Sequence, residues 1–136
     1  MEIVLNERWV FLSKEKTKKV FLKKLSGFKN YSLTNEQNNF QLLRFPLLLK
    51  NKQQKESLLS ELKKKGLGAT EMYPAPLNLF KDTNQFFNSN EHYPNARSLS
   101  ERILTLPLHE YVTENDIDTI KTIMQKIIRK DEKKTN

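Results

Sequence analysis

The side chains of this sequence that could support catalysis are few and widely separated. The 136 residues contain no cysteine and two histidines, His92 and His109. A thiolate nucleophile, a disulfide framework, an iron–sulfur cluster and a cysteine-ligated or histidine-rich zinc site are therefore excluded. The three glycines, Gly27, Gly66 and Gly68, lack the spacing of a phosphate-binding loop. We expect no catalytic residue, no cofactor-binding residue and no metal ligand in this chain by itself.

Two polar features resemble catalytic groups but have simpler explanations. Glu114, Asp116 and Asp118 are close in sequence, and they fall in the first turn of an amphipathic segment. Carboxylates there interact favourably with the partial positive charge of a helix N-terminus. Lys14 follows Ser13 in a lysine-rich helix, where an exposed amine remains a solvated ammonium rather than a nucleophile. Both features are predicted to be structural.

Helix and strand patterns alternate along the chain, and no internal repeat is visible. The predicted elements, in order, are a helix over 7–25, a strand over 41–50, a helix over 51–65, a strand over 67–73, a helix over 95–102, a strand over 103–107 and a helix from about 113 to 130. This order predicts an α/β fold with two layers, like an α+β domain: a small three-stranded sheet with helices packed on one face.

Local signals mark several ends of these elements. Pro46 has no N–H to donate, so the strand that contains it is predicted at a sheet edge. Asn51 suits the N-cap of the next helix, and Gly66 suits the position just after that helix ends. Thr113 and Asp116 form a capping-box pattern at the start of the last helix.

Positive charge is concentrated in the first half of the chain. The net charge is +8, and residues 1–65 hold 15 Lys and Arg against 6 Asp and Glu, whereas residues 66–136 hold 9 against 10. One hypothesis is a basic nucleic-acid-binding module that uses the lysine-rich residues 8–65 and the aromatic residues among them. The alternative is the solvated face of a helix. The scarcity of arginine there argues against nucleic-acid binding.

The length fits one domain. The first residues carry Glu2, Glu7 and Arg8 among apolar positions, so they lack the pattern of a secretory signal. No apolar run approaches the roughly 18 residues that a membrane-spanning helix needs. We therefore expect a cytoplasmic protein with no membrane partner.

Residues 93–120 carry a combination of motifs that resembles the C-terminal signature of a known family. A Tyr-Pro-Asn-Ala segment opens a short helix, a Leu-Thr-Leu-Pro-Leu-His segment ends at His109, and Val-Thr-Glu-Asn-Asp-Ile starts the last helix. Two upstream segments match the pattern of the same family: the helix and turn over 58–68, and the Tyr-Pro-Ala-Pro-Leu loop over 73–77. Over residues 40–130 the sequence resembles the small domain of the DegT/DnrJ family of sugar-nucleotide aminotransferases.

The resemblance implies the small-domain fold of fold type I aminotransferases over residues 40–130. An N-terminal helix and linker would occupy residues 1–39, and residues 131–136 would be a disordered tail. The family are transferases that use pyridoxal phosphate to transaminate a keto-sugar nucleotide, for example in polysaccharide biosynthesis. Their catalytic lysine lies in a Ser-x-His-x-x-Lys context within a large domain, and nothing in this sequence resembles that context. We therefore expect the chain alone to be inactive and to bind no cofactor.

The resemblance also implies site residues and partners. Tyr73, Asn78 and His109 are the predicted substrate contacts, although Met72 and Asn78 stand where many relatives carry histidines. The predicted partners are a large catalytic domain or a second aminotransferase subunit, a homodimer included, together with a nucleotide-sugar substrate. The chain is expected to be a gene remnant, a split subunit or an excised piece.

Overall fold

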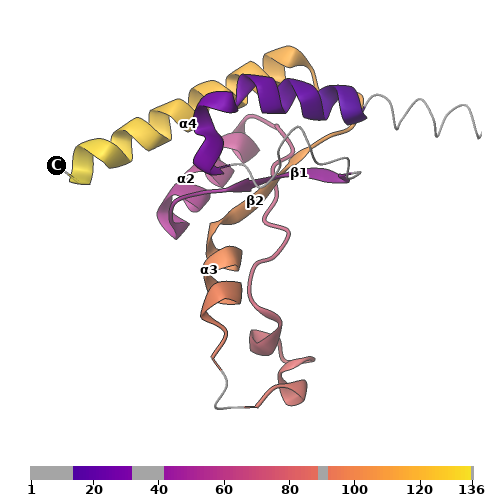
Figure 1. Ribbon diagram of the computed structural model, residues 1–136, viewed down its shortest axis with the longest axis vertical. Helices are drawn as coiled ribbons and strands as arrows, with labels where there is room; N and C mark the ends of the chain where they lie inside the picture. The colour runs from indigo at the N-terminus through magenta and orange to yellow at the C-terminus, as the bar shows by residue number, and fades with distance from the viewer. Residues whose placement is uncertain (1–13, 32–41, 89–91, 136) are drawn as a thin grey trace, which may run out of the picture.

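The described residues of the chain form a two-stranded antiparallel sheet (Figure 1). The computed structural model describes residues 14–31, 42–88 and 92–135. Within these ranges, β1 (Arg44–Leu48) pairs with β2 (Ile103–Pro107) along the full length of both strands. The two strands are far apart in sequence, so the sheet joins the middle of the chain to the segment before the last helix.

The prediction of a third strand over 67–73 is wrong. Among the described residues this segment makes a single bridge, in which Thr70 and Thr105 exchange two hydrogen bonds of 2.8 and 3.0 Å. Gly66 and Gly68 have φ angles of 67° and 65°, a left-handed conformation that turns the chain just before the bridge. The backbone then leaves the sheet after Thr70, so only one residue meets β2.

Pro46 lies at the edge of the sheet, as predicted. Its partner in the register is Thr105, whose N–H and C=O both bond Thr70 on the other side. Pro46 and Thr105 therefore form a pair that exchanges no hydrogen bonds in an antiparallel ladder. The missing N–H of proline costs nothing at such a position.

Helix α2 (Lys52–Lys64) has both of its predicted caps. Asn51 Oδ1 accepts the N–H of Gln54 at 2.8 Å. At the other end, the N–H groups of Gly66 and Leu67 bond carbonyls of the last turn, each at 3.0 Å. This pair of bonds is a Schellman motif, which needs the positive φ that glycine adopts without strain.

Helix α4 (Glu114–Thr135) begins at the predicted capping box. The Asp116 N–H donates to Thr113 Oγ1 at 3.1 Å, and the Thr113 N–H donates to Asp116 Oδ2 at 2.8 Å. The helix continues to Thr135, so residues 131–135 are helical where the sequence predicted a disordered tail. No glycine or proline interrupts this segment, and cations near its end interact favourably with the helix C-terminus.

The N-terminal helix shares the core of the sheet. Its described part covers residues 14–24 and leads into η1 (Ser26–Tyr31); the predicted start at residues 7–13 lies outside the described residues. Phe21 is fully buried, and its ring stacks on that of Phe45 in β1 with centroids 5.0 Å apart. The helix is therefore part of the same folded unit as the strands.

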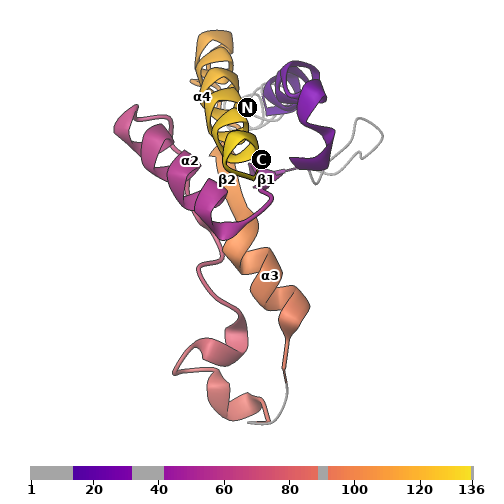
Figure 2. The same cartoon turned by 90° about the vertical axis from the view of Figure 1, so that its left-hand side faces the viewer.

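The N-terminal helix, α2 and α4 gather around the strands at one end of the molecule (Figures 1 and 2). In β1, Phe45 and Leu47 are buried and alternate with partly exposed residues. All five residues of β2 are buried, so β2 is covered on both faces and β1 on one. The residues of the buried core are Phe21, Leu25, Phe45, Leu47, Leu49, Leu58, Leu59, Leu62, Ala69, Leu104, Leu106, Leu108, Ile117, Ile120, Ile123 and Met124. None of the described helices is long and apolar enough to cross a membrane.

The segment between Thr70 and Ile103 projects away from this core (Figure 2). We call its described residues, 71–88 and 92–102, the arm, and the remaining described residues the body. The outgoing limb of the arm carries two short 3-10 turns, η2 (Leu77–Leu79) and η3 (Asn84–Phe86). The returning limb is α3, Pro94–Arg102, which starts with proline as predicted and runs directly into β2.

Candidate functional site

Two of the predicted substrate-contact residues lie on the outgoing limb of the arm. Tyr73 is 54% exposed, and Asn78 is half-buried within η2. The prolines between them hold the backbone extended. The Thr83 hydroxyl donates a hydrogen bond to the Leu77 carbonyl, which closes the turn that contains Asn78. Both residues therefore lie on the loop that projects from the body.

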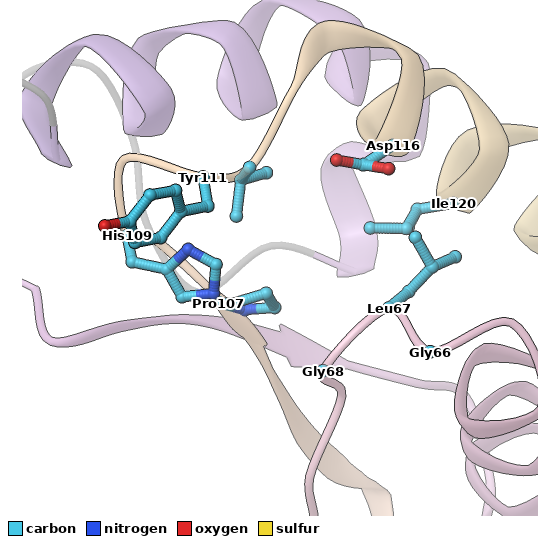
Figure 3. Close-up of a pocket in the computed structure, with 9 residues that line it drawn as sticks. Gly66, Leu67, Gly68, Pro107, His109, Tyr111, Asp116 and Ile120 are labelled. Carbon is cyan, nitrogen blue, oxygen red and sulfur yellow. The ribbon is translucent and has the colours of Figure 1, made fainter.

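The third residue, His109, lies on the body in a small hollow (Figure 3). The hollow has a volume of about 140 Å³ and lies between the glycine turn at 66–68, Pro107 at the end of β2, and the first turns of α4. A Cβ at Gly68 would approach the Cγ of Pro107 to 3.3 Å, so the glycine allows the turn to lie against the strand.

His109 has little support as an acid or a base. Its side chain is exposed, and within the described part of the chain no hydrogen bond orients the imidazole. Its backbone carbonyl accepts the Val112 N–H at 3.1 Å, and its ring lies 5.9 Å from that of Tyr111. Tyr73 and Asn78 do not line this hollow. The structure therefore separates His109 from the other two predicted contacts.

The acidic residues at the start of α4 are engaged in structural contacts, as predicted. The Thr113 N–H and hydroxyl both donate to Asp116, which lowers the pKa of its carboxyl. Lys24 Nζ lies 2.7 Å from Asp118 and 3.5 Å from Glu114, and the hydrogen bond to Asp118 raises the pKa of Lys24. Among the described residues, no three His, Cys, Asp or Glu side chains are grouped as metal ligands.

A wider cleft of about 670 Å³ lies between η1 and α4. Lys24, Lys121 and Arg129 line it together with Phe28 and Glu132. Of the two hollows, this cleft has the lining that better resembles the hypothetical nucleic-acid site, because it carries three cations and an aromatic ring. Five of the thirteen lysines in residues 8–65 are in ion pairs within the described part of the chain: Lys18, Lys24, Lys52, Lys55 and Lys64. Of these five, only Lys24 and Lys55 are in ion pairs with carboxylates outside this segment, so the ion pairs offset only a small part of its positive charge.

Comparison of the sequence with protein families gives a match over most of the chain. A model of the DegT/DnrJ/EryC1/StrS aminotransferase family matches residues 9–125. The chain belongs to this family. The match confirms the resemblance in residues 93–120, and it also includes the N-terminal helix. The boundary at residue 39 in this DegT/DnrJ family chain stays a prediction.

Solved structures with a similar fold are aminotransferases. Spr1654 from Streptococcus pneumoniae, described as a sugar aminotransferase, has a TM-score of 0.76 and 18% identity over 96% of this chain and 35% of its own. A family aminotransferase from Brucella abortus has a TM-score of 0.65 and 22% identity, over 83% of this chain and 30% of its own. Helicobacter pylori PseC, an aminotransferase involved in the biosynthesis of pseudoaminic acid, has a TM-score of 0.65 and 17% identity over 93% and 35%.

At these identities the likeness shows the fold alone. The DegT/DnrJ family chain spans about a third of the length of the solved aminotransferases. Comparison with curated proteins finds no match.

Two polar side chains of the body were missed by sequence reasoning. Arg44 donates from Nε to Thr105 Oγ1 at 2.8 Å, and its partial burial lowers the pKa of the guanidinium. Lys55 is buried in α2. A signal for Lys55 was present, because it stands three and four residues before Leu58 and Leu59 on the apolar stripe of the helix.

Proposed function

We propose that this chain is the small domain of a pyridoxal phosphate-dependent sugar-nucleotide aminotransferase and that a large domain, absent from the described residues, supplies the catalytic lysine and the cofactor. The reaction would be transamination of a keto-sugar nucleotide in the cytoplasm, as in polysaccharide biosynthesis. The chain alone would be inactive. The observation that carries this proposal is the family match over residues 9–125. The arm supports the part that concerns a missing domain, because it presents apolar side chains to solvent.

The apolar residues of the arm are the proposed contact surface for that large domain, or for a second subunit. Exposed apolar patches of this kind mark interaction sites, because a monomer gains nothing from leaving them in water. Seven large apolar residues of the arm are exposed: Met72, Tyr73, Leu77, Leu79, Phe80, Phe86 and Leu99. Phe87 does pack within the arm, with its ring 5.5 Å from that of Tyr93.

Tyr73 and Asn78 are the substrate contacts that the arm supports best. Both are on the loop that projects from the body, where a nucleotide sugar bound between two domains could reach them. His109 lies in a separate hollow, so it would contact the substrate from a different side. We therefore propose Tyr73 and Asn78 ahead of His109.

We propose that the lysines of this chain do not hold the cofactor, and the contacts of three of them support this. The two buried ammonium groups, Lys18 and Lys55, lie 3.1 Å from Glu15 and Glu71 respectively, and neither lines a hollow described above. Lys24 is held by two carboxylates. The proposed contribution of this chain is therefore to form one wall of the substrate cleft and to exclude water from it.

Reductive labelling tests where the cofactor chemistry resides. The purified chain is incubated with an equimolar amount of pyridoxal phosphate, reduced with borohydride, and its adducts are mapped by intact mass and peptide analysis. We expect scattered, substoichiometric labelling of many lysines, similar to that of the urea-unfolded chain used as a control. A single lysine labelled to completion in the folded chain alone would show a self-contained cofactor site and overturn the proposal.

A further inference from the structure

Lys55 has contacts that are unusual for a lysine in the first turn of an amphipathic helix. The residue is 4% exposed. Its Nζ donates to the backbone carbonyl of Ser100 in α3 at 2.8 Å and lies 3.1 Å from Glu71 Oε2. Glu71 is the first residue of the outgoing limb, and Ser100 is near the end of the returning limb. One ammonium group thus joins α2 to both limbs of the arm.

The contact with Ser100 also caps a helix. The last carbonyls of an α-helix have no partner within the helix and carry a partial negative charge, so a cation placed there is favourable. At the end of α3 the Ser100 carbonyl accepts from Lys55, and the Arg102 carbonyl accepts from the Leu49 N–H at 2.9 Å. Arg102 Nε returns a bond of 2.8 Å to the Leu49 carbonyl. The base of the returning limb is therefore held by polar contacts with the body.

We propose that Lys55 is a positioning residue that sets the direction of the arm relative to the body. It acts on the two limbs at once, and the segment that begins at Glu71 carries Tyr73 two residues later. The contact surface and the proposed substrate contacts on the arm would both depend on this alignment. The inference concerns the geometry of the chain and does not depend on the proposed enzymatic activity.

Distances between two spin labels test the proposal. The chain has no cysteine, so Lys81→Cys on the arm and Lys130→Cys on α4 provide unique labelling sites at exposed positions. Double electron–electron resonance is measured on labelled protein diluted into unlabelled protein, which removes intermolecular pairs. Lys55→Met keeps the aliphatic stem and removes the charge. Lys52→Met is the matched control on the same helix, because that side chain is 64% exposed and lies 3.8 Å from Glu56.

We expect a narrow distance distribution for the parent chain and for Lys52→Met, and loss of that narrow distribution in Lys55→Met. Lys55→Arg, which restores a cation, is expected to recover part of it. An unchanged distribution in folded Lys55→Met would overturn the proposal. If Lys55→Met fails to fold by circular dichroism, Glu71→Gln decides, because this side chain is 44% exposed: a broadened distribution supports the proposal and an unchanged one overturns it.

Discussion

In the body, twelve large apolar side chains are less than 2% exposed, whereas seven of the nine exposed large apolar residues among those described lie in the arm. The two regions have similar apolar side chains but different surroundings. Leu58 of the body is fully buried, while Leu79 of the arm is 61% exposed. Apolar composition alone therefore does not say which residues form the core. An apolar residue becomes part of the core only where neighbouring helices and strands cover its segment.

The contacts of the arm with the body are of a different kind from those inside the body. The core joins Phe21, Phe45 and the apolar faces of α2 and α4. The base of the arm is held through Lys55 and Arg102, which bond backbone carbonyls. Apolar burial stabilises the body, and polar contacts orient the arm. An arm built in this way is suited to meet a second surface.

The largest difference between the two regions is expected for phenylalanine truncation. Phe45→Ala removes a fully buried ring that stacks on Phe21 and should lower the free energy of unfolding by about 3 to 5 kcal/mol. Phe86→Ala, at a position that is 77% exposed, should change it by less than about 0.5 kcal/mol. Urea denaturation followed by circular dichroism measures both. Equal losses would show that the arm belongs to the same cooperative core.

The next largest loss of stability is expected at the glycine turn over residues 66–68, which leads from the body to the arm. Gly66 and Gly68 both have positive φ, but only at Gly68 would a Cβ meet Pro107. Gly66→Ala should cost about 1 kcal/mol from backbone strain alone. Gly68→Ala should cost more, because the methyl group also crowds the strand. Thermal denaturation compares the two variants, and a smaller loss for Gly68→Ala would contradict the packing of the turn against β2.

Threonine hydroxyls allow a comparison of smaller effects. Thr113→Ala removes the cap of α4 and should lower the free energy of unfolding by about 1 kcal/mol. Thr83→Ala removes a hydroxyl that bonds the Leu77 carbonyl within the arm, and global stability should be unchanged. Chemical denaturation of both variants would sharpen the comparison. A loss at Thr83 as large as that at Thr113 would argue for an arm that unfolds together with the body.

The capping box also predicts that the stability of the folded chain depends on pH. Hydrogen bonds from Thr113 lower the pKa of Asp116 in the folded state. The stabilisation they provide is therefore present above the ordinary pKa of an aspartate and is lost as the pH falls through the lowered value. Asp116→Asn should lower the melting temperature slightly at neutral pH, and the difference from the parent should shrink in acid. A difference in melting temperature between Asp116→Asn and the parent that stays constant from neutral to acid pH would contradict this role of Asp116.

Features that depend on near neighbours in the chain could be predicted from the sequence. The caps at Asn51, Gly66 and Thr113 rest on bonds that span a few residues, and the structure confirms all three. The edge position of Pro46 follows from its missing N–H. The prediction of a three-stranded sheet was wrong because the pairing of residues 67–73 depends on the position of β2 in the fold. A local sequence pattern carries no information on that position.

The site was harder to predict than the fold. Tyr73 was expected on an extended loop and is found there, but its distance from the hollow of His109 is a tertiary property. Lys55 was overlooked because charged residues are usually solvated, and its partners are in α3 and at the start of the arm. The roles of Tyr73, Asn78 and His109 toward a substrate stay predictions.

Binding of a hydrophobic dye tests the contrast between body and arm most directly. The chain is compared with a variant carrying Leu77→Ser, Leu79→Ser and Phe86→Ser in the arm, and with a control carrying Leu43→Ser and Tyr111→Ser at exposed positions of the body. The account predicts that the parent binds the dye or self-associates, that the arm variant loses this behaviour with an unchanged melting temperature, and that the control keeps it. A parent chain that is monomeric and binds no dye would contradict the account.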